Sequence, residues 1–242
     1  MIKREAPASF FTITLVTNFT IKAEEMGRKP LKSEHIPKAT IGRLAVYIQV
    51  LERLKAEGTE VISSENLAQA CSVNSSQIRK DLAYFGEFGV RGVGYYVPEL
   101  ITSIKQSLGV DRVWNCCIVG VGNLGRALLR HGEFKSKGFN IKVAFDCDPY
   151  KIGEIVEGLE VICTRKTRNL VDEQKLEIGI ITTPPERAQR AANYLVEAGI
   201  KGIINYAPSR IEVPDHIPLE YVDFIHHFYA LAFHINLGKA VE

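Results

Sequence analysis

The chain has 242 residues, of which 46% are hydrophobic, and a formal net charge of +2 at pH 7. This length and composition are sufficient for two modest domains that each bury a core. Because the charge is almost neutral, a general basic coat is excluded as the basis for nucleic-acid binding, and any DNA site must come from the local placement of basic side chains.

The first 33 residues fit no domain pattern. The apolar run at residues 10–21 is too short, and too often interrupted by Thr and Asn, to cross a membrane. No convincing small-residue cleavage site follows it, so a signal peptide is not expected. We expect residues 1–33 to be a disordered extension, either an over-extended gene start or a regulatory arm, and we expect no membrane partner.

Residues 34–112 are predicted to form a compact helical DNA-binding domain. Ser63 and Ser64 offer N-caps for a short second helix, and Asn74 with Gln77 resembles a capping box that starts a third. The result is a helix-turn-helix arrangement. It is preceded by a first helix that ends near Gly58, with one buried stripe of apolar residues at helical spacing: Ile41, Leu44, Ala45, Ile48, Leu51 and Leu54.

The predicted third helix has the side chains that a helix in the DNA major groove needs. Ile78, Leu82 and Phe85 share its inward face, which leaves polar and basic residues outside. Gln and Arg can read base edges, whereas Ser, Lys and Tyr can hold phosphates. The alternative is an ordinary solvated helix face. The candidate DNA-binding residues are Ser75, Ser76, Gln77, Arg79, Lys80 and Tyr84.

Residues 88–96 favour the DNA interpretation. Glycine alternates there with apolar or basic residues, which predicts a β-ribbon wing with Arg91 near its tip. An arginine in that position can enter a narrow A·T-rich minor groove. Arg91 is therefore added to the candidate DNA-binding residues.

Residues 113–218 are predicted to form a Rossmann-type, doubly wound parallel sheet that binds a dinucleotide. An apolar strand at residues 113–119 leads into the run Gly120-Val121-Gly122-Asn123-Leu124-Gly125, which opens a helix. Gly120 permits the tight turn, Gly122 lets the backbone approach a pyrophosphate, and Gly125 lets the helix pack closely on the sheet. The helix N-terminus would hold the phosphates.

An acidic residue is expected about 20 residues further on, at the end of the second strand. Asp146 follows the strand at residues 141–145, and its carboxylate favours NAD over NADP because it would repel a 2′-phosphate. Asp148 is an alternative for the same contact. Later strand ends add Thr183 and Pro184 to the candidate cofactor-binding residues, and Asn205 at the next strand end, close to where a nicotinamide ring would lie.

Residues 219–242 contain a helix that is apolar over most of its circumference. Such a helix requires burial on more than one side, which fits a position between two subunits. Its histidines, His226, His227 and His234, lack a carboxylate or cysteine at ligand spacing, so no metal is expected. The five cysteines of the chain also lack metal-ligand spacing and are typical of buried thiols in a reducing cytoplasm.

Four collinear motifs carry a more specific resemblance. The sequences at residues 77–86 (QIRKDLAYFG), 91–95 (RGVGY), 120–125 (GVGNLG) and 199–208 (GIKGIINYAP) resemble those of the redox-sensing transcriptional repressors of the Rex family. The resemblance implies a homodimer of winged-helix and Rossmann domains that exchanges its C-terminal helices and loses operator DNA when NADH binds. It gives Gln77, Arg79, Lys80 and Arg91 the DNA role, residues 120–125 with Asp146 the cofactor role, and Asp223 and Phe224 a place at the interface.

Two positions depart from the family pattern. His131 stands where members often have a tyrosine near the nicotinamide, and Gln49 stands where some have a basic residue. His131 paired with Asp223 would make sensing depend on pH, although a histidine at a helix end can also be a solvated cap.

The sequence therefore predicts a cytoplasmic repressor, not an enzyme, that senses the NADH/NAD⁺ ratio and binds a palindromic operator as a dimer. NADH would favour a dimer geometry that binds DNA poorly. An NAD-dependent dehydrogenase is one alternative, but the segment after Tyr206 is too short for a substrate domain. A redox-blind DNA-binding protein with a structural nucleotide is another.

Overall fold

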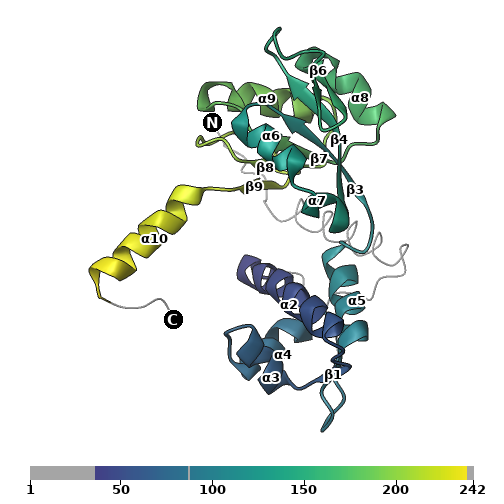
Figure 1. Ribbon diagram of the computed structural model, residues 1–242, viewed down its shortest axis with the longest axis vertical. Coiled ribbons are helices and arrows are strands. Elements are labelled where there is room, and N and C mark those ends of the chain that lie inside the picture. Colours follow the sequence, from purple (N-terminus) through teal and green to yellow (C-terminus); the bar gives the residue numbers. More distant parts are fainter. Residues whose placement is uncertain (1–35, 87, 239–242) are drawn as a thin grey trace, which may run out of the picture. The chain divides into compact units, whose positions relative to one another are not determined.

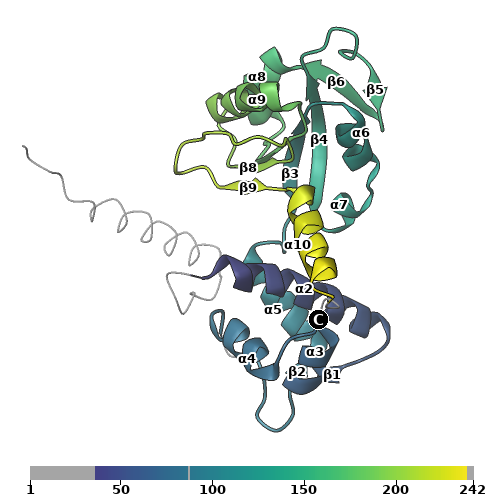
Figure 2. The same cartoon turned by 90° about the vertical axis from the view of Figure 1, so that its left-hand side faces the viewer.

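The computed structural model describes residues 36–86 and 88–238. The extension expected at residues 1–33 lies outside the described residues. The chain divides after Asp111 into two compact units, which are described separately (Figures 1 and 2). Over the described ranges, no helix is both long enough and apolar enough to span a membrane.

The N-terminal unit is helical, with one small sheet. The strands β1 (Val61–Ile62) and β2 (Tyr95–Tyr96) pair in an antiparallel manner. α5 packs against α2, and α3 packs against α4. The helices are α2 (Lys38–Ala56), α3 (Ser64–Ala70), α4 (Ser75–Ala83) and α5 (Val97–Leu108).

The buried face of α2 differs from the predicted stripe. Ile41 is 44% exposed, and Ala45 is exposed too. Thr40 and Tyr47 are buried instead, beside Leu44, Ile48 and Leu51. The two polar side chains donate hydrogen bonds to the buried Asp81 of α4, which apolar periodicity cannot anticipate.

The helix α5 was not predicted, although the sequence carries signals for it. Pro98 lies in its first turn, and Gly109 ends it in the left-handed conformation at φ 67°. Leu100, Ile101 and Ile104 supply its buried face.

The predicted wing is a short turn rather than an extended ribbon. Val90 and Gly94 form an isolated bridge, and Arg91 lies exposed in the turn between them. The chain then enters β2, which pairs with β1 instead of with residues 88–90.

The C-terminal unit contains a seven-stranded sheet with the order β5-β6-β4-β3-β7-β8-β9. All neighbouring strands are parallel except β5 and β6, which confirms the predicted doubly wound α/β fold. The strands are β3 (Trp114–Val119), β4 (Phe139–Asp146), β5 (Ile155–Val156), β6 (Leu159–Cys163), β7 (Ile178–Ile181), β8 (Gly202–Asn205) and β9 (Leu219–Tyr221).

Helices cover both faces of this sheet (Figure 2). Alternate residues of β3 show the two layers, since Cys117 and Val119 belong to the core under α8 and α9, whereas Cys116 and Ile118 belong to the core under α6. The helical elements are α6 (Asn123–Arg130), α7 (Glu133–Ser136), the 3-10 helix η1 (Thr164–Lys166), α8 (Thr167–Glu173) and α9 (Pro185–Glu197).

The last helix, α10 (Phe224–Asn236), is drawn in yellow in Figure 1 and has no buried residue. Phe228, Tyr229, Phe233 and Ile235 are between 60% and 73% exposed. An exchange of this helix between subunits involves two copies of the chain, so the structure of one chain does not test it. The exposed apolar face nevertheless agrees with the predicted need for a partner.

Candidate functional site

The glycine-rich loop lies where the order of strands reverses. β3 has β4 on one side and β7 on the other, and the loop leaves the carboxyl end of β3. Open α/β sheets bind their ligands at this switch point. The local fold therefore places residues 120–125 where a nucleotide is expected.

The three glycines have different surroundings. Gly120 has φ +103°, and a Cβ on it would lie 2.9 Å from backbone atoms of Thr182 and Thr183. A Cβ on Gly125 would collide with the Gly120 carbonyl oxygen. A Cβ on Gly122 would have no protein atom within 4 Å. The protein itself thus requires the first and third glycines, whereas only a ligand would require the second.

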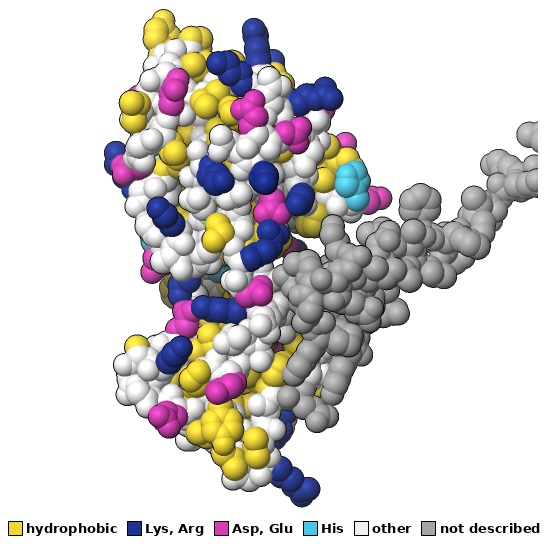
Figure 3. Space-filling model, turned by 90° about the vertical axis from the view of Figure 1, so that its right-hand side faces the viewer, with side chains coloured by type: hydrophobic (Ala, Val, Ile, Leu, Met, Phe, Trp, Pro, Cys, Tyr) yellow, Lys and Arg dark blue, Asp and Glu magenta, His cyan; other side chains and the backbone are white. Residues whose placement is uncertain are grey.

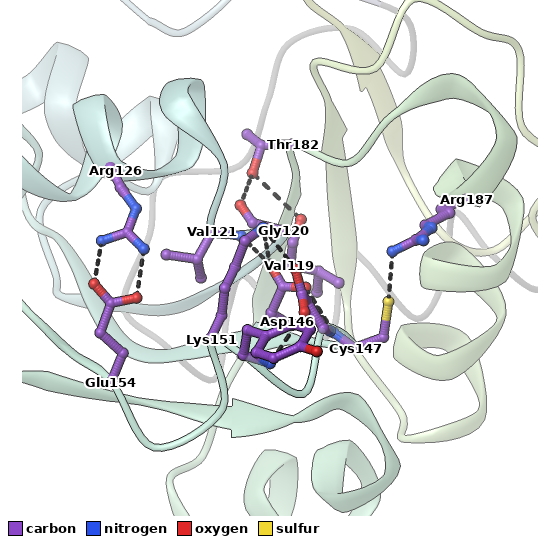
Figure 4. A network of polar contacts seen from close by, with 12 residues as sticks. Val119, Gly120, Val121, Arg126, Asp146, Cys147, Lys151, Glu154, Thr182 and Arg187 are labelled. Carbon is purple, nitrogen blue, oxygen red and sulfur yellow. Dashed lines mark hydrogen bonds and ion pairs between the residues drawn. The ribbon is translucent and has the colours of Figure 1, made fainter.

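Two side chains hold the loop in place (Figure 4). The Thr182 hydroxyl donates to the Gly120 carbonyl oxygen at 2.6 Å. The Val121 N–H donates to Asp146 Oδ2 at 2.8 Å, which ties the loop to the end of β4. Thr182 was missed by sequence analysis because nothing in a single threonine indicates such a distant partner.

Asp146 is 5% exposed, and both oxygens of its carboxylate have hydrogen-bond partners. The N–H groups of Cys147 and Asp148 donate to Oδ1 at 2.8 and 2.9 Å, and Lys151 Nζ lies 3.2 Å from Oδ2. Burial alone would raise the pKa of Asp146, but these hydrogen bonds and the Lys151 ammonium outweigh it and hold the pKa below its usual value. Asp146 therefore fixes the loop, and a contact to ribose would be an additional task.

A cavity of about 850 Å³ opens beside the loop. Gly120, Gly122, Asp146, Thr183 and Pro184 are among the predicted residues that line it. Its lining also includes Asp148, the alternative acid, and the basic side chains of Lys151, Arg165, Arg187 and Arg190. The volume is in the range of small-molecule and cofactor sites.

The residues present fit an anionic dinucleotide. No side chain caps the N-terminus of α6, so the N–H groups at Asn123 and Leu124 are available to an anion. Thr183 Oγ1 is buried and, among the described residues, has no hydrogen-bond partner. An unpartnered hydroxyl at the cavity wall and a helix start without a side-chain cap both suit an anionic ligand with hydrogen-bonding groups.

Asn205 is the last residue of β8, at the strand end where it was predicted, and its side chain makes hydrogen bonds inside the protein. Its side chain is fully buried, accepts from the Ala207 N–H at 2.9 Å and donates to the Ser209 carbonyl oxygen at 2.9 Å. These bonds shape the turn after β8. The structure thus gives Asn205 a role in supporting the edge of the site.

The predicted switch residues do not meet within one chain. His131 lies at the end of α6, where its Nε2 is 3.6 Å from Glu133 and its ring contacts Phe134. Asp223 caps α10 by accepting from the Ile225 N–H at 2.9 Å. Phe224 packs its ring near that of Tyr206, at a centroid distance of 6.3 Å.

Sequence analysis also missed side-chain contacts made by α6 and α9. Arg126 of α6 forms a bidentate ion pair with Glu154, at 2.6 and 2.5 Å. Arg187 of α9 donates to Cys147 Sγ at 3.1 Å (Figure 4). These partners are far apart in the sequence and carry no local motif.

The candidate DNA site belongs to the N-terminal unit. Ser63 caps α3, and Asn74 caps α4 by accepting from the Gln77 N–H at 2.8 Å. Ile78, Leu82 and Phe85 face the core as predicted. Ser76, Lys80 and Arg91 are exposed, and Ser75, Gln77 and Tyr84 are partly exposed.

Arg79 is exposed but oriented by neighbouring side chains. It donates to Ser64 Oγ at 2.8 Å, to Glu65 Oε1 at 3.2 Å and to Ser75 Oγ at 3.3 Å. Arg79 and Arg91 line a groove of about 660 Å³ between α4, the start of α3 and the wing. On the face seen in Figure 3, basic and acidic side chains are mixed, in agreement with local rather than general basic character.

A buried carboxylate joins α2 to α4. Asp81 is fully buried and forms a bidentate ion pair with Arg43, with both contacts at 2.6 Å. It also accepts from Tyr47 at 2.8 Å, from Gln77 Nε2 at 2.8 Å and from Thr40 at 3.1 Å. Gln77, expected to face DNA, thus has one amide N–H engaged inside the unit.

Burial would raise the pKa of Asp81, but the hydrogen bonds from these donors outweigh it and hold the pKa below its usual value. The carboxylate is therefore ionised at neutral pH. We call Thr40, Arg43, Tyr47, Gln77 and Asp81 the Asp81 cluster.

Family models match both units. Residues 35–83 match the model described as putative DNA-binding protein N-terminus, and residues 111–209 match the CoA binding domain. The chain is 75% identical over 206 residues to the redox-sensing transcriptional repressor Rex of Maridesulfovibrio salexigens, with 85% of this chain and 99% of that protein covered. It is 68% identical over 209 residues to the protein of the same name from Solidesulfovibrio magneticus, with 86% and 95% covered.

Solved structures are similar as well. The chain resembles RSP, a Rex-family repressor, in complex with β-NAD⁺ and operator DNA, with a TM-score of 0.80, 37% identity, and 84% of this chain and 94% of that chain covered. The complex of RSP with β-NADH gives a TM-score of 0.77 and 35% identity, with 84% and 95% covered.

Proposed function

The chain belongs to the Rex family of redox-sensing transcriptional repressors, and from this premise we propose that it represses transcription in response to the NADH/NAD⁺ ratio. One observation carries the proposal. A helix-turn-helix with a wing and a glycine-rich nucleotide cavity occupy separate units of the same chain. As a Rex repressor it is a DNA-binding regulator and not an enzyme, and the nucleotide is its sensed ligand.

The N-terminal unit is the proposed DNA reader. Its groove and the exposed start of α4 support major-groove binding, with the wing turn directed at the neighbouring minor groove. Arg79 and Gln77 are assigned to base edges and Ser, Lys and Tyr side chains to phosphates. The proposed residues are Ser75, Ser76, Gln77, Arg79, Lys80, Tyr84 and Arg91.

The C-terminal unit is the proposed sensor of NAD(H). The pyrophosphate would be held by N–H groups at the start of α6, and Thr183 Oγ1 would find its hydrogen-bond partner on the ligand. The ligand supplies the signal through the oxidation state of its nicotinamide. The proposed residues are Gly120, Val121, Gly122, Asn123, Leu124, Gly125, Asp146, Thr183 and Pro184, with Asn205 in support.

The proposed repressor is a homodimer held together through α10. The apolar, exposed face of this helix supports the proposal, and the two-fold symmetry would require a palindromic operator. Asp223 and Phe224 at the start of α10, and His131 at the end of α6, are the proposed switch residues at the interface. Because its target is the chromosome, the protein would act in the cytoplasm.

Release of DNA by NADH follows from linkage between two dimer geometries. A ligand that binds the DNA-free geometry more tightly lowers operator affinity by the ratio of its two affinities. NAD⁺ must discriminate less, or in the opposite sense, because a ligand with equal affinity for both geometries changes nothing.

The decisive experiment is a fluorescence anisotropy titration of a labelled A·T-rich inverted-repeat duplex at fixed salt. We expect micromolar NADH to release the duplex and NAD⁺ not to. Tight, sequence-specific binding that ignores both nucleotides would favour a redox-blind protein with a structural nucleotide. Oxidation of a small alcohol or hydroxy acid coupled to reduction of NAD⁺ would instead favour the dehydrogenase alternative.

A further inference from the structure

The Asp81 cluster holds the Gln77 side chain at the start of the DNA-reading helix. It leaves one N–H and the oxygen of the Gln77 carboxamide unused. This inference rests on the proposed function: because α4 reads operator DNA, we propose that Asp81 is a positioning residue that presents the Gln77 carboxamide to an adenine base. Asp81 itself is fully buried and would never touch the DNA.

The hydrogen bond between the two side chains fixes which way the carboxamide faces. An ionised carboxylate can only accept, so the Gln77 atom 2.8 Å from Asp81 Oδ1 must be the amide nitrogen. One N–H of that nitrogen is used. Among the described residues, Gln77 Oε1 has no hydrogen-bond partner.

The unused edge of the carboxamide has a specific complement. Its oxygen accepts, and the second N–H of its nitrogen donates. Adenine presents the matching pair in the major groove, with an N6 amino donor beside the N7 acceptor. Guanine presents two acceptors there, at O6 and N7, so the fixed carboxamide discriminates against it.

The position of Gln77 in α4 suits this contact. It is the third residue of the helix, and recognition helices contact base edges with their N-terminal residues. The Asp81 carboxylate cannot rotate away, because Arg43 holds both of its oxygens and Tyr47 holds one, all from α2. A side chain that is already ordered loses less conformational entropy when it binds.

The cluster could instead serve only to fasten α2 to α4. A purely structural role predicts that its variants change stability and bind all duplexes more weakly by the same factor. The positioning role predicts the loss of discrimination at one adenine. The two roles therefore differ in a base-level measurement.

The test uses the full chain and the inverted-repeat duplex that it selects from a random pool. Each adenine is replaced in turn by 7-deazaadenine, which removes N7 and leaves base pairing intact. We expect one adenine in each half-site at which the replacement weakens binding about tenfold. We expect Gln77→Met to bind the selected duplex more weakly than the unchanged protein does. In this variant, 7-deazaadenine at that adenine should weaken binding no further.

Variants of the cluster then separate positioning from packing. Asp81→Asn is expected to lose the same 7-deazaadenine penalty while NADH binding by the other unit is unchanged. Arg43→Lys provides a second variant at a side chain that is 30% exposed, and is expected to reduce the penalty. Lys80→Ala is the matched control on α4: loss of a phosphate contact weakens all duplexes alike and leaves the penalty intact.

The outcomes are distinct. A 7-deazaadenine penalty that persists in Gln77→Met, or in both Asp81→Asn and Arg43→Lys, overturns the inference. Operator binding that NADH releases, but that no 7-deazaadenine weakens, also overturns it and leaves the proposed function standing. If no duplex is bound better than a scrambled one, the proposed function fails, and this inference fails with it.

Discussion

At the scale of single residues, the glycines of the nucleotide loop give a pair of opposite predictions. Gly122→Ala should leave stability unchanged, because its methyl would have no protein atom within 4 Å, yet it should weaken NADH binding strongly by meeting the pyrophosphate. Gly125→Ala should cost about 2 kcal/mol in stability through its collision with the Gly120 carbonyl. Thermal unfolding and NADH fluorescence titrations measure both effects.

Gly132→Ala is the matched control, since a Cβ there also has no protein atom within 4 Å and the residue lies outside the cavity lining. It should change neither quantity. Normal NADH affinity in Gly122→Ala would contradict the assignment of this loop to the pyrophosphate.

Asp146 has two possible roles, to hold the glycine-rich loop in place and to contact the ribose of the nucleotide, and its variants distinguish them. Asp146→Asn should lower NADH affinity about tenfold, because the loop loses a charged acceptor for the Val121 N–H. The affinity for NADPH should fall by the same factor. Asp148→Asn, at a partly exposed carboxylate, should affect NADH less.

Calorimetric titration of both nucleotides decides between these tasks. If Asp146→Asn binds NADH normally and gains affinity for NADPH, then Asp146 contacts the ribose as the sequence predicts, and its hydrogen bonds to the loop are of minor importance.

Three predicted site residues also have partners inside the protein that sequence analysis did not find. Gln77, Asp146 and Asn205 were predicted as ligand contacts because polar residues at strand ends and on outward helix faces commonly bind ligands. Asp146 and Asn205 have hydrogen-bond partners inside the protein for both polar atoms of their side chains, and Gln77 has one for its amide nitrogen. Local sequence cannot indicate this, because the partners of Asp146 and Asn205 depend on how a loop folds, and Asp81 is held by residues of another helix.

At the scale of elements, the contact between α2 and α4 should depend on pH. The pKa of Asp81 is lower in the folded state than in the unfolded chain, so the stabilisation is complete above the unfolded value of about 3.9 and is lost as the pH falls through the folded value. Urea unfolding of the N-terminal unit should therefore show falling stability below about pH 4.

Asp81→Asn is the control for this dependence, because it cannot ionise. Its stability should be lower at neutral pH and should change less with acid, although other carboxylates still contribute. An acid dependence equal to that of the unchanged protein would show that Asp81 does not carry the effect.

The helix α10 gives a prediction about assembly. Phe228→Glu places a charge on a side chain that is 66% exposed in one chain and lies in the proposed dimer interface. Loss of its burial should weaken the dimer by about 3 kcal/mol or more. Light scattering during size-exclusion chromatography should then report one chain at concentrations where the unchanged protein gives two.

Ile155→Glu is the matched control, because Ile155 is 73% exposed on β5, outside the proposed interface. Its mass should remain that of two chains. An unchanged mass in Phe228→Glu would exclude α10 as the centre of the interface.

Most elements follow from periodicity and from capping residues. The strand, glycine loop and helix at residues 114–130 and the caps at Ser63 and Asn74 needed only local information. The stripe of α2 could not be predicted correctly, because Thr40 and Tyr47 are buried by their bonds to Asp81. The helix α5 could have been found from Pro98, Gly109 and the apolar spacing between them.

At the scale of the whole molecule, linkage makes a reciprocal prediction. If saturating NADH lowers operator affinity by some factor, saturating operator must lower NADH affinity by the same factor. Fluorescence titration of NADH with and without the duplex measures it. Unequal factors at equilibrium would contradict a single two-state dimer, and a duplex without the inverted repeat serves as the control.

The arrangement of two copies is the part of the molecule that neither periodicity nor motifs can define. The sequence indicates that α10 requires a partner, because it is apolar on most sides. Which residues it meets depends on surfaces that are far apart in the chain, as with His131 and Asp223, which have separate partners within one copy.

The exposed face of α10 also has a consequence for the lifetime of the protein in the cell. A newly made copy without its partner carries large apolar side chains in water, such as Phe228, Tyr229 and Phe233. Chaperones and proteases select surfaces of this kind. Dimer formation would bury these side chains, so the half-life of the repressor should rise with its own concentration. At low expression a larger fraction of the copies would be unpaired, and the protein would be degraded faster.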